Sequence, residues 1–254
     1  MSQAYGDLFA KVYHEKWVTF AKQLAPRILD FYSNKLISQT NKKILDLCCG
    51  TGQLAFFFLE NDYKVVGIDL SASMLHYAKE NTKEYINKGM AKFIKGDAAS
   101  FSLEERFGLV VSTFDSLNHL DGEESLYSCF KSVLNVVIDG GYFVFDLNTK
   151  LGLQRWNSIS INESDEIIII NRGIFDRENS RALTKISGFI NNGEGLYQRF
   201  DEVVYNTAYD MGRVKDMLLD IGWKDIYFAR SNDLLTPIEE PEKEGRVFII
   251  SRKE

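Results

Sequence analysis

Apolar and polar residues between positions 40 and 150 alternate in two different rhythms. Near-continuous apolar runs are typical of strands buried on both faces of a parallel sheet, and segments with apolar residues three or four positions apart predict amphipathic helices. The strand-like runs lie at 42–47, 64–70, 91–97, 107–113 and 140–147, and the helix-like segments lie at 52–61, 71–86 and 123–138, with Ser71 expected as an N-cap. Strands and helices in this order predict a parallel sheet covered by helices.

The alternation stops at about residue 150. Three strand-like segments follow, separated by turn-rich sequence, and they predict a meander of three antiparallel strands at 166–175, 182–190 and 195–205. A helix-like segment and two strand-like segments end the chain, at 211–222, 223–230 and 245–251. We therefore expect residues 150–208 to be a small antiparallel β insertion within a core made of residues 41–149 and 209–254.

Residues 1–40 have a helical pattern of their own. Their apolar residues recur at three- and four-residue steps, at Phe9, Tyr13, Trp17, Phe20 and Leu24. Pro26 is expected to interrupt or end this helix, and a second helical piece continues to about Leu36.

Composition narrows the class of protein. The chain has 254 residues, of which 45% are hydrophobic and 26% are charged, which suits one large ordered domain with an insertion. A net charge of -6 without a basic stripe argues against nucleic-acid binding. The N-terminal sequence lacks the apolar stretch of a signal peptide, and no apolar run approaches the length of a membrane span. We expect a cytoplasmic protein that does not enter a membrane.

Two carboxylates end neighbouring strands of the predicted sheet. Asp46 precedes a turn containing Gly50 and Gly52, and Asp69 ends the next strand. At the carboxyl edge of a parallel sheet, such glycines let the backbone approach a ligand, and an acid after the second strand can accept hydrogen bonds from ribose hydroxyls. A nicotinamide-dependent oxidoreductase would also place an acid there, but it would show a third glycine that this chain lacks.

Five motifs in order separate these two readings. They are ILDLCCGTG at 44–52, VVGIDLSASML at 65–75, FIKGDAASF at 93–101, FGLVVSTFDSLNHL at 107–120 and GGYFVFDL at 140–147. Together they resemble the motifs of the class I S-adenosylmethionine-dependent methyltransferases over residues 40 to 150. The resemblance implies a Rossmann-like α/β fold with a seven-stranded sheet whose last strand is antiparallel.

The resemblance also implies a set of cofactor-binding residues. Asp46 and the backbone from Cys48 to Gly52 would meet the amino-acid end of S-adenosylmethionine, and Asp69 would bind the ribose. The adenine would contact Leu70, Met74, Asp97 and Ala98, and the methionine portion would lie near Thr113 and Phe114. Many family members have glycine where this chain has Cys48, and we expect reduced backbone freedom there without loss of binding.

The cysteines could suggest metal or metalloid chemistry instead. Cys48 and Cys49 belong to the turn, however, and Cys129 lies in a predicted helix, so no set of spaced thiolate ligands is evident. We interpret all three as small core residues and expect no metal site.

The segment after the fourth predicted strand carries the polar candidates for the acceptor side, namely Asp115, Asn118 and His119. His119 could take a proton from an acceptor hydroxyl or amine at neutral pH, and it is our candidate catalytic residue. The alternative is a histidine that only packs against or caps the following helix.

The insertion and the N-terminal helix are expected to surround the acceptor. The opening LFAKVYHEKW resembles that of relatives whose N-terminal helix folds over the cofactor as a lid, although His14 replaces the usual acid. The resemblance implies that residues 1–40 of this chain form a helical lid. An ordinary apolar helix face is the alternative. A β insertion at this place resembles that of small-molecule methyltransferases, including sugar-amine N-methyltransferases, where it shapes the acceptor pocket and in some cases a homodimer contact. Aromatic and basic residues that could line this pocket are Trp156, Tyr197, Arg199 and Tyr205.

The sequence thus predicts an S-adenosylmethionine-dependent methyltransferase that methylates an N or O atom of a small molecule. Two alternatives stay open at this point. One is an NAD(P)-dependent Rossmann oxidoreductase, and the other is a protein that binds S-adenosylmethionine without catalysis. The sequence does not name the acceptor.

Overall fold

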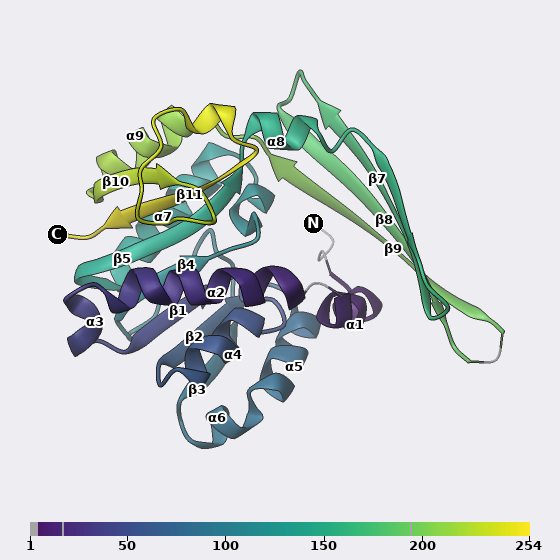
Figure 1. Ribbon diagram of the computed structural model, residues 1–254, viewed down its shortest axis with the longest axis horizontal. Helices are drawn as coiled ribbons and strands as arrows, with labels where there is room; N and C mark the ends of the chain where they lie inside the picture. Colours follow the sequence, from purple (N-terminus) through teal and green to yellow (C-terminus); the bar gives the residue numbers. More distant parts are fainter. Residues whose placement is uncertain (1–4, 17, 194) are drawn as a thin grey trace.

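A computed structural model describes residues 5–16, 18–193 and 195–254, and seven of the described strands form one mixed sheet (Figure 1). In sheet order the strands are β10 (Lys224–Ala229), β11 (Arg246–Arg252), β5 (Val137–Asn148), β4 (Phe107–Ser112), β1 (Lys43–Leu47), β2 (Lys64–Asp69) and β3 (Ala91–Lys95). The ladders between β5, β4, β1, β2 and β3 are parallel, and β11 is antiparallel to both of its neighbours. The predicted α/β fold, with an antiparallel last strand, is confirmed.

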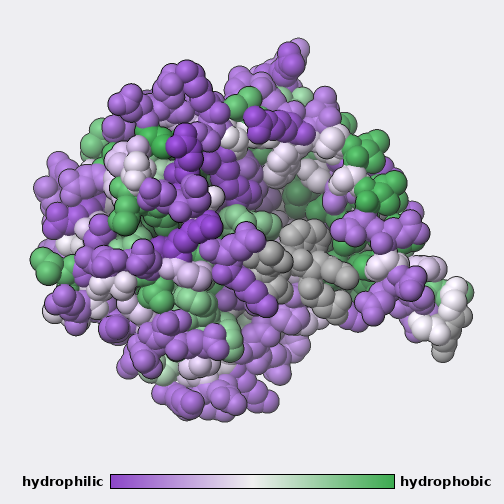
Figure 2. All heavy atoms as spheres, in the orientation of Figure 1, coloured by the Kyte–Doolittle hydropathy of each residue, from purple (hydrophilic) through white to green (hydrophobic). Residues whose placement is uncertain are grey.

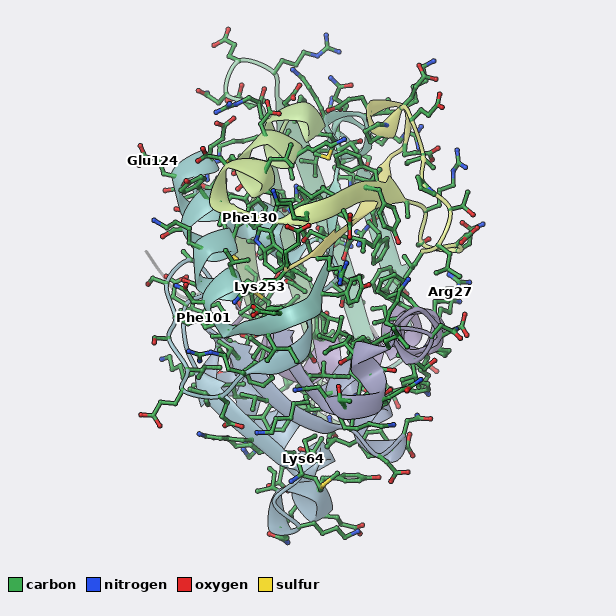
Figure 3. All side chains as sticks on the ribbon, turned by 90° about the vertical axis from the view of Figure 1, so that its left-hand side faces the viewer. Arg27, Lys64, Phe101, Glu124, Phe130 and Lys253 are labelled. Carbon is green, nitrogen blue, oxygen red and sulfur yellow. The ribbon has the colours of Figure 1, made fainter. Side chains whose placement is uncertain are left out.

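Helices cover both faces of this sheet. One face packs against α7 (Glu123–Val136) and α9 (Met211–Ile221), and the other packs against α2 (Val18–Ser33), α4 (Gln53–Glu60) and α5 (Ala72–Asn81). Alternate residues of β1 supply the two cores, since Leu45 lies in the first and Ile44 in the second. Phe130 shows the packing on the first face, where its ring lies 5.2 Å from that of Phe145 in β5 (Figure 3).

Helix α2 differs from the prediction because it continues through Pro26. A proline inside a helix removes one backbone hydrogen bond and costs about 3 kcal/mol. The residues around it offset this cost, because Leu24, Ala25 and Ile28 are buried against the sheet. Trp17, which belongs to the predicted apolar face, lies outside the described residues. Short helices that the pattern did not predict are α3 (Ile37–Thr40) and α8 (Lys150–Gln154). The helix predicted at 71–86 is divided at Thr82 into α5 and α6 (Lys83–Asn87).

The insertion contains a second sheet, which projects from the core at the right of Figure 1. Its described strands are β6 (Ile159–Glu163), β7 (Ile167–Asp176), β8 (Arg181–Asn191) and β9 (Tyr197–Thr207), paired antiparallel in sequence order. The prediction of three strands was therefore wrong by one. Strand β6 is short, exposed along its whole length and paired only with β7, so it lacks the burial that makes the other strands visible in the sequence. Figure 2 shows hydrophobic residues on the surface over this sheet.

Helix α1 (Asp7–Lys16) lies between the core and the insertion sheet (Figure 1). Phe9, Ala10 and Val12 are buried there against β7, β8 and β9 of the insertion, together with Met74 of α5. The N-terminal segment thus bridges the two sheets. Among the described residues, no helix combines the length and the apolarity needed to cross a membrane.

Candidate active site

The strand order reverses between β1 and β4, and the turn after β1 lies at this switch point. Cys48, Gly50 and Gly52 have φ values of 62°, 53° and 75°, in the left-handed region. A Cβ atom on Gly52 would lie 3.0 Å from the Cα atom of Ala78, so glycine is needed there for packing as well as for conformation. Cys48 therefore adopts a backbone conformation that favours glycine.

Asp69, at the end of β2, holds two loops together. Its Oδ2 atom accepts a hydrogen bond from the Gly50 N–H at 2.8 Å, and Oδ1 accepts one from the Ser71 N–H at 2.8 Å. Burial raises the pKa of this carboxyl above its usual value, although these backbone donors act in the opposite direction. Ser71 is the N-cap of α5, as predicted, and its hydroxyl accepts a hydrogen bond from the Met74 N–H.

Asp46 lies beneath the same turn and is almost completely buried. Its Oδ2 atom has no hydrogen-bond partner among the residues that the structure describes. Burial and the neighbouring Asp69 raise its pKa to about 8, and a backbone N–H of Ala55 limits the rise. A buried carboxylate with an unused oxygen can accept a hydrogen bond from a ligand.

The residues predicted to meet an adenine ring have different surroundings. Leu70 is 54% exposed, which is unusual for a leucine at the end of a buried strand. Asp97 is exposed and accepts a hydrogen bond from the Ala99 N–H, whereas Ala98 is buried. Met74 is buried in the apolar cluster that α1 forms with the insertion.

The loop after β4 is held by a buried ion-pair network. Phe114 and Asp115 have φ values of 67° and 50°, which cost energy for residues other than glycine. Arg246 of β11 donates to the carboxylates of Asp115 and Asp146, at 2.6 Å and 2.7 Å, and its guanidinium also lies over the ring of Phe114. Burial alone would lower the pKa of Arg246, but the two carboxylates outweigh it and the net change is upward.

Two of the three polar acceptor-side candidates form ion pairs or hydrogen bonds within the protein that hold this loop. Asp115 pairs with Arg246 and also accepts a hydrogen bond from Asn206. The Asn118 side chain is fully buried and bonds the backbone of Asn148 and Thr207. Both residues therefore stabilise the site rather than face a ligand.

His119 differs from Asp115 and Asn118 because only one of its two ring nitrogens is bonded to the backbone, and the other can accept a hydrogen bond or a proton. Nδ1 lies 2.9 Å from the carbonyl oxygen of Tyr205 in β9, and a carbonyl can only accept a hydrogen bond. Nδ1 must therefore carry the proton, which leaves Nε2 of the neutral ring with a lone pair. The hydroxyl of Tyr5 lies 3.3 Å from Nε2.

A small pocket of about 50 Å³ lies between the turn after β1 and the loop after β4, and its volume is far below the roughly 300 Å³ of an ordinary ligand pocket. It is lined by the turn after β1, the loop after β4 and α1 and α2, through residues that include Cys48, Gly50, Thr113, Phe114, Tyr13 and Phe20. The aromatic side chains of Tyr13 in α1 and Phe20 in α2 narrow the pocket. A larger hollow of about 220 Å³ lies between α2 and residues 232–235, and none of the motif residues lines it.

Methyltransferases are among the known proteins that match this chain. Residues 44–141 match the methyltransferase domain family. A Bacillus subtilis protein named "Putative methyltransferase YqeM" is 24% identical over 99% of this chain and 95% of its own length.

Solved structures agree at the level of the fold. An S-adenosylmethionine-dependent methyltransferase from Clostridium acetobutylicum has a TM-score of 0.78 at 24% identity, over 97% of this chain and 98% of its own. The sugar N-methyltransferase KedS8 from Streptoalloteichus has a TM-score of 0.72 at 17% identity, over 100% of this chain and 98% of its own.

Residues 44–141 are a methyltransferase domain, and the chain has the fold of the class I S-adenosylmethionine-dependent methyltransferases. The methyltransferase domain decides against the nicotinamide-dependent oxidoreductase. Features of this structure fit S-adenosylmethionine as the cofactor of the methyltransferase. Asp46 has an unused buried oxygen, and Leu70 presents an exposed apolar side chain beside Asp69.

Sequence reasoning missed Arg246 and Asp146 as parts of this site, and it missed the contact between Tyr5 and His119. Arg246 comes from the last strand, 131 positions from Asp115, and Tyr5 lies 114 positions from His119. Nothing in the local sequence marks these pairs. An arginine in an apolar last strand and an aspartate inside GGYFVFDL were the available signals, because a buried charge needs a partner.

Proposed function

We propose that this methyltransferase methylates an oxygen or nitrogen atom that carries a hydrogen, on a small molecule, and that His119 accepts the proton. The observation that carries the proposal is the hydrogen bond between Nδ1 of His119 and the Tyr205 carbonyl, which leaves Nε2 as a lone-pair acceptor. Such a nitrogen can orient a hydroxyl, a phenol or a neutral amine and take its proton.

Residues around the sheet edge would hold the cofactor. We assign the methionine end to Asp46, the turn from Cys48 to Gly52, Thr113 and Phe114, and we assign the ribose to Asp69. The adenine would lie by Leu70, Met74, Asp97 and Ala98. S-adenosylmethionine supplies an activated sulfonium methyl group when bound, so the protein has to align the acceptor and exclude water.

The N-terminal helices serve as a lid in this proposal, and the insertion forms the acceptor side. Tyr13 and Phe20 line the small pocket, and α1 packs against the insertion sheet. This arrangement supports a site that closes over its ligands and keeps water out. The name of KedS8 describes a sugar N-methyltransferase, which is compatible with a small acceptor for this chain.

The test is transfer of labelled methyl from S-adenosylmethionine to a panel of small molecules. The panel pairs protic groups, such as sugar amines, phenols and alcohols, with matched aprotic ones, such as tertiary amines and carboxylates. We expect label on protic members only. Label on aprotic members, or transfer only to a protein or RNA added as a control, would contradict the proposal.

A further inference from the structure

Tyr5 is held in a strained conformation by contacts from distant parts of the chain. Its φ of 72° is left-handed, which is costly for a tyrosine. Its N–H donates to Glu202 of β9 at 3.3 Å, and the next N–H, of Gly6, donates to the same carboxylate at 2.7 Å. Its carbonyl accepts a hydrogen bond from the Ser71 hydroxyl at 3.0 Å. Residues 66 and 197 positions away therefore fix this one backbone unit.

In this position the phenol of Tyr5 contacts His119, the candidate base. Because Nε2 of His119 carries a lone pair, the Tyr5 hydroxyl at 3.3 Å is the donor in this contact. The Tyr5 ring stacks on Phe9, with centroids 4.8 Å apart and planes at 19°, and meets the edge of the His119 ring at 87°. A planar ring with a hydroxyl thus occupies the one lone pair that the proposed reaction needs.

We propose that Tyr5 is a gate at the acceptor site, whose phenol holds the position that an incoming acceptor takes over. The inference rests on the proposed role of His119. An acceptor with its own O–H or N–H replaces the hydrogen bond to Nε2, and a flat acceptor also replaces the stacking on Phe9. Phenols and aromatic amines are therefore the class that this position fits best.

The geometry allows Tyr5 to leave without unfolding the lid. Helix α1 begins at Asp7, so Tyr5 precedes the helix and can move while Phe9 and Val12 stay buried. Movement releases the strain at φ 72° and exchanges the long hydrogen bonds of Tyr5 for bonds to water. Glu202 holds Tyr5 in place, because its carboxylate accepts hydrogen bonds from the consecutive N–H groups of Tyr5 and Gly6.

Chemical labelling of histidine tests the gate without any knowledge of the natural acceptor. Diethyl pyrocarbonate carbethoxylates neutral imidazole, and the chain has only three histidines, so mass spectrometry of peptides gives a rate for each. His76 is exposed and serves as the internal reference. We expect Tyr5→Ala to raise the rate at His119 by about fivefold or more, as the loss of a shielding hydrogen bond predicts.

A second variant tests the same gate by removing the carboxylate that holds Tyr5 in place. Glu202→Ala leaves the phenol intact but removes the acceptor of both N–H groups, and we expect it also to raise the rate at His119. Ser73→Ala is the matched control, because the Ser73 hydroxyl bonds Asp7 of α1, whereas the hydrogen bonds of Tyr5 involve Glu202, His119 and Ser71. It should leave the rate unchanged. Equal rates at His119 in the wild type, Tyr5→Ala and Glu202→Ala would overturn the proposal.

A ring added in solution tests what the position accepts. In Tyr5→Ala, p-cresol should restore the protection of His119, whereas toluene, which lacks the hydroxyl, should not. If p-cresol and toluene both protected His119 equally, or if neither protected it, the position would not recognise a hydroxyl group and the proposal would be contradicted. Calorimetry of S-adenosylhomocysteine with each variant separates this result from the proposed function, since cofactor binding can persist whether or not Tyr5 is a gate.

Discussion

Arg246 and Asp115 form a short ion pair, at 2.6 Å, that joins the last strand of the sheet to the loop carrying His119. The Arg246 side chain is 25% exposed and that of Asp115 is 8% exposed, so little water screens the pair. Asp146, with no exposed side-chain surface, completes the network. These charges hold Phe114 and Asp115 in left-handed conformations, and the loop therefore depends on a strand more than a hundred residues away.

Replacing Arg246 should destabilise the protein strongly. Arg246→Leu leaves two buried carboxylates without their cationic partner, and such a loss costs about 3–5 kcal/mol. Urea denaturation measures the free energy of unfolding. Arg252→Leu is the control, because its pair with Asp225 is exposed on both sides and should contribute about 0–1 kcal/mol. Similar losses in the two variants would show that the buried network does not stabilise this loop.

Asp46 should make stability depend on pH. Its pKa is about 8 in the folded protein, above the roughly 3.9 of an unfolded aspartate, so the folded state binds the proton more tightly. The contribution is fully present below about pH 4 and is lost as the pH rises through about 8. Asp46→Asn, which cannot ionise, should flatten the fall in unfolding free energy over this range. The exposed Asp216→Asn should not, and an unchanged pH profile in Asp46→Asn would exclude the raised pKa.

Gly52 should be needed for packing as well as for backbone conformation. Gly52 and Gly89 have similar φ values, 75° and 68°, but a Cβ atom on Gly52 would lie 3.0 Å from Ala78, whereas one on Gly89 would meet nothing within 4 Å. Both alanine variants pay the left-handed penalty of about 1–2 kcal/mol. Only Gly52→Ala should also weaken S-adenosylhomocysteine binding in calorimetry, because it displaces the turn from α5. Equal affinities in the two variants would contradict this role.

The fold could be predicted from the sequence because burial leaves a pattern. Strands covered on both faces have near-continuous apolar runs, and Ser71 stands directly before a helical repeat. Strand β6 left no such pattern, since its residues are exposed. Pro26 was misread because local propensity predicts an interruption, while tertiary burial of its neighbours keeps the helix continuous.

The placement of the candidate site residues at one edge of the sheet could be predicted only for residues at strand ends or in the loops that follow them. Asp46 and Asp69 stand at strand ends and His119 lies in the loop after β4, so topology brings them to one edge of the sheet. The partners that decide their chemistry come from elsewhere in the chain. Tyr205 fixes the protonated nitrogen of His119, and Arg246 removes Asp115 from the list of acceptor-side groups. Such pairings depend on the insertion and on the last strand, whose placement no local pattern specifies.

The role of His119 can be measured in a single turnover with any protic acceptor that takes label in the panel. Removal of a positioned proton acceptor lowers a rate by about 10²–10⁴-fold. His76→Ala, on the exposed side of α5, is the matched control. We predict that His119→Ala transfers methyl at least about a hundredfold more slowly than wild type, with unchanged S-adenosylhomocysteine affinity, and that His76→Ala is unaffected. Equal single-turnover rates in His119→Ala and the wild type would contradict the account.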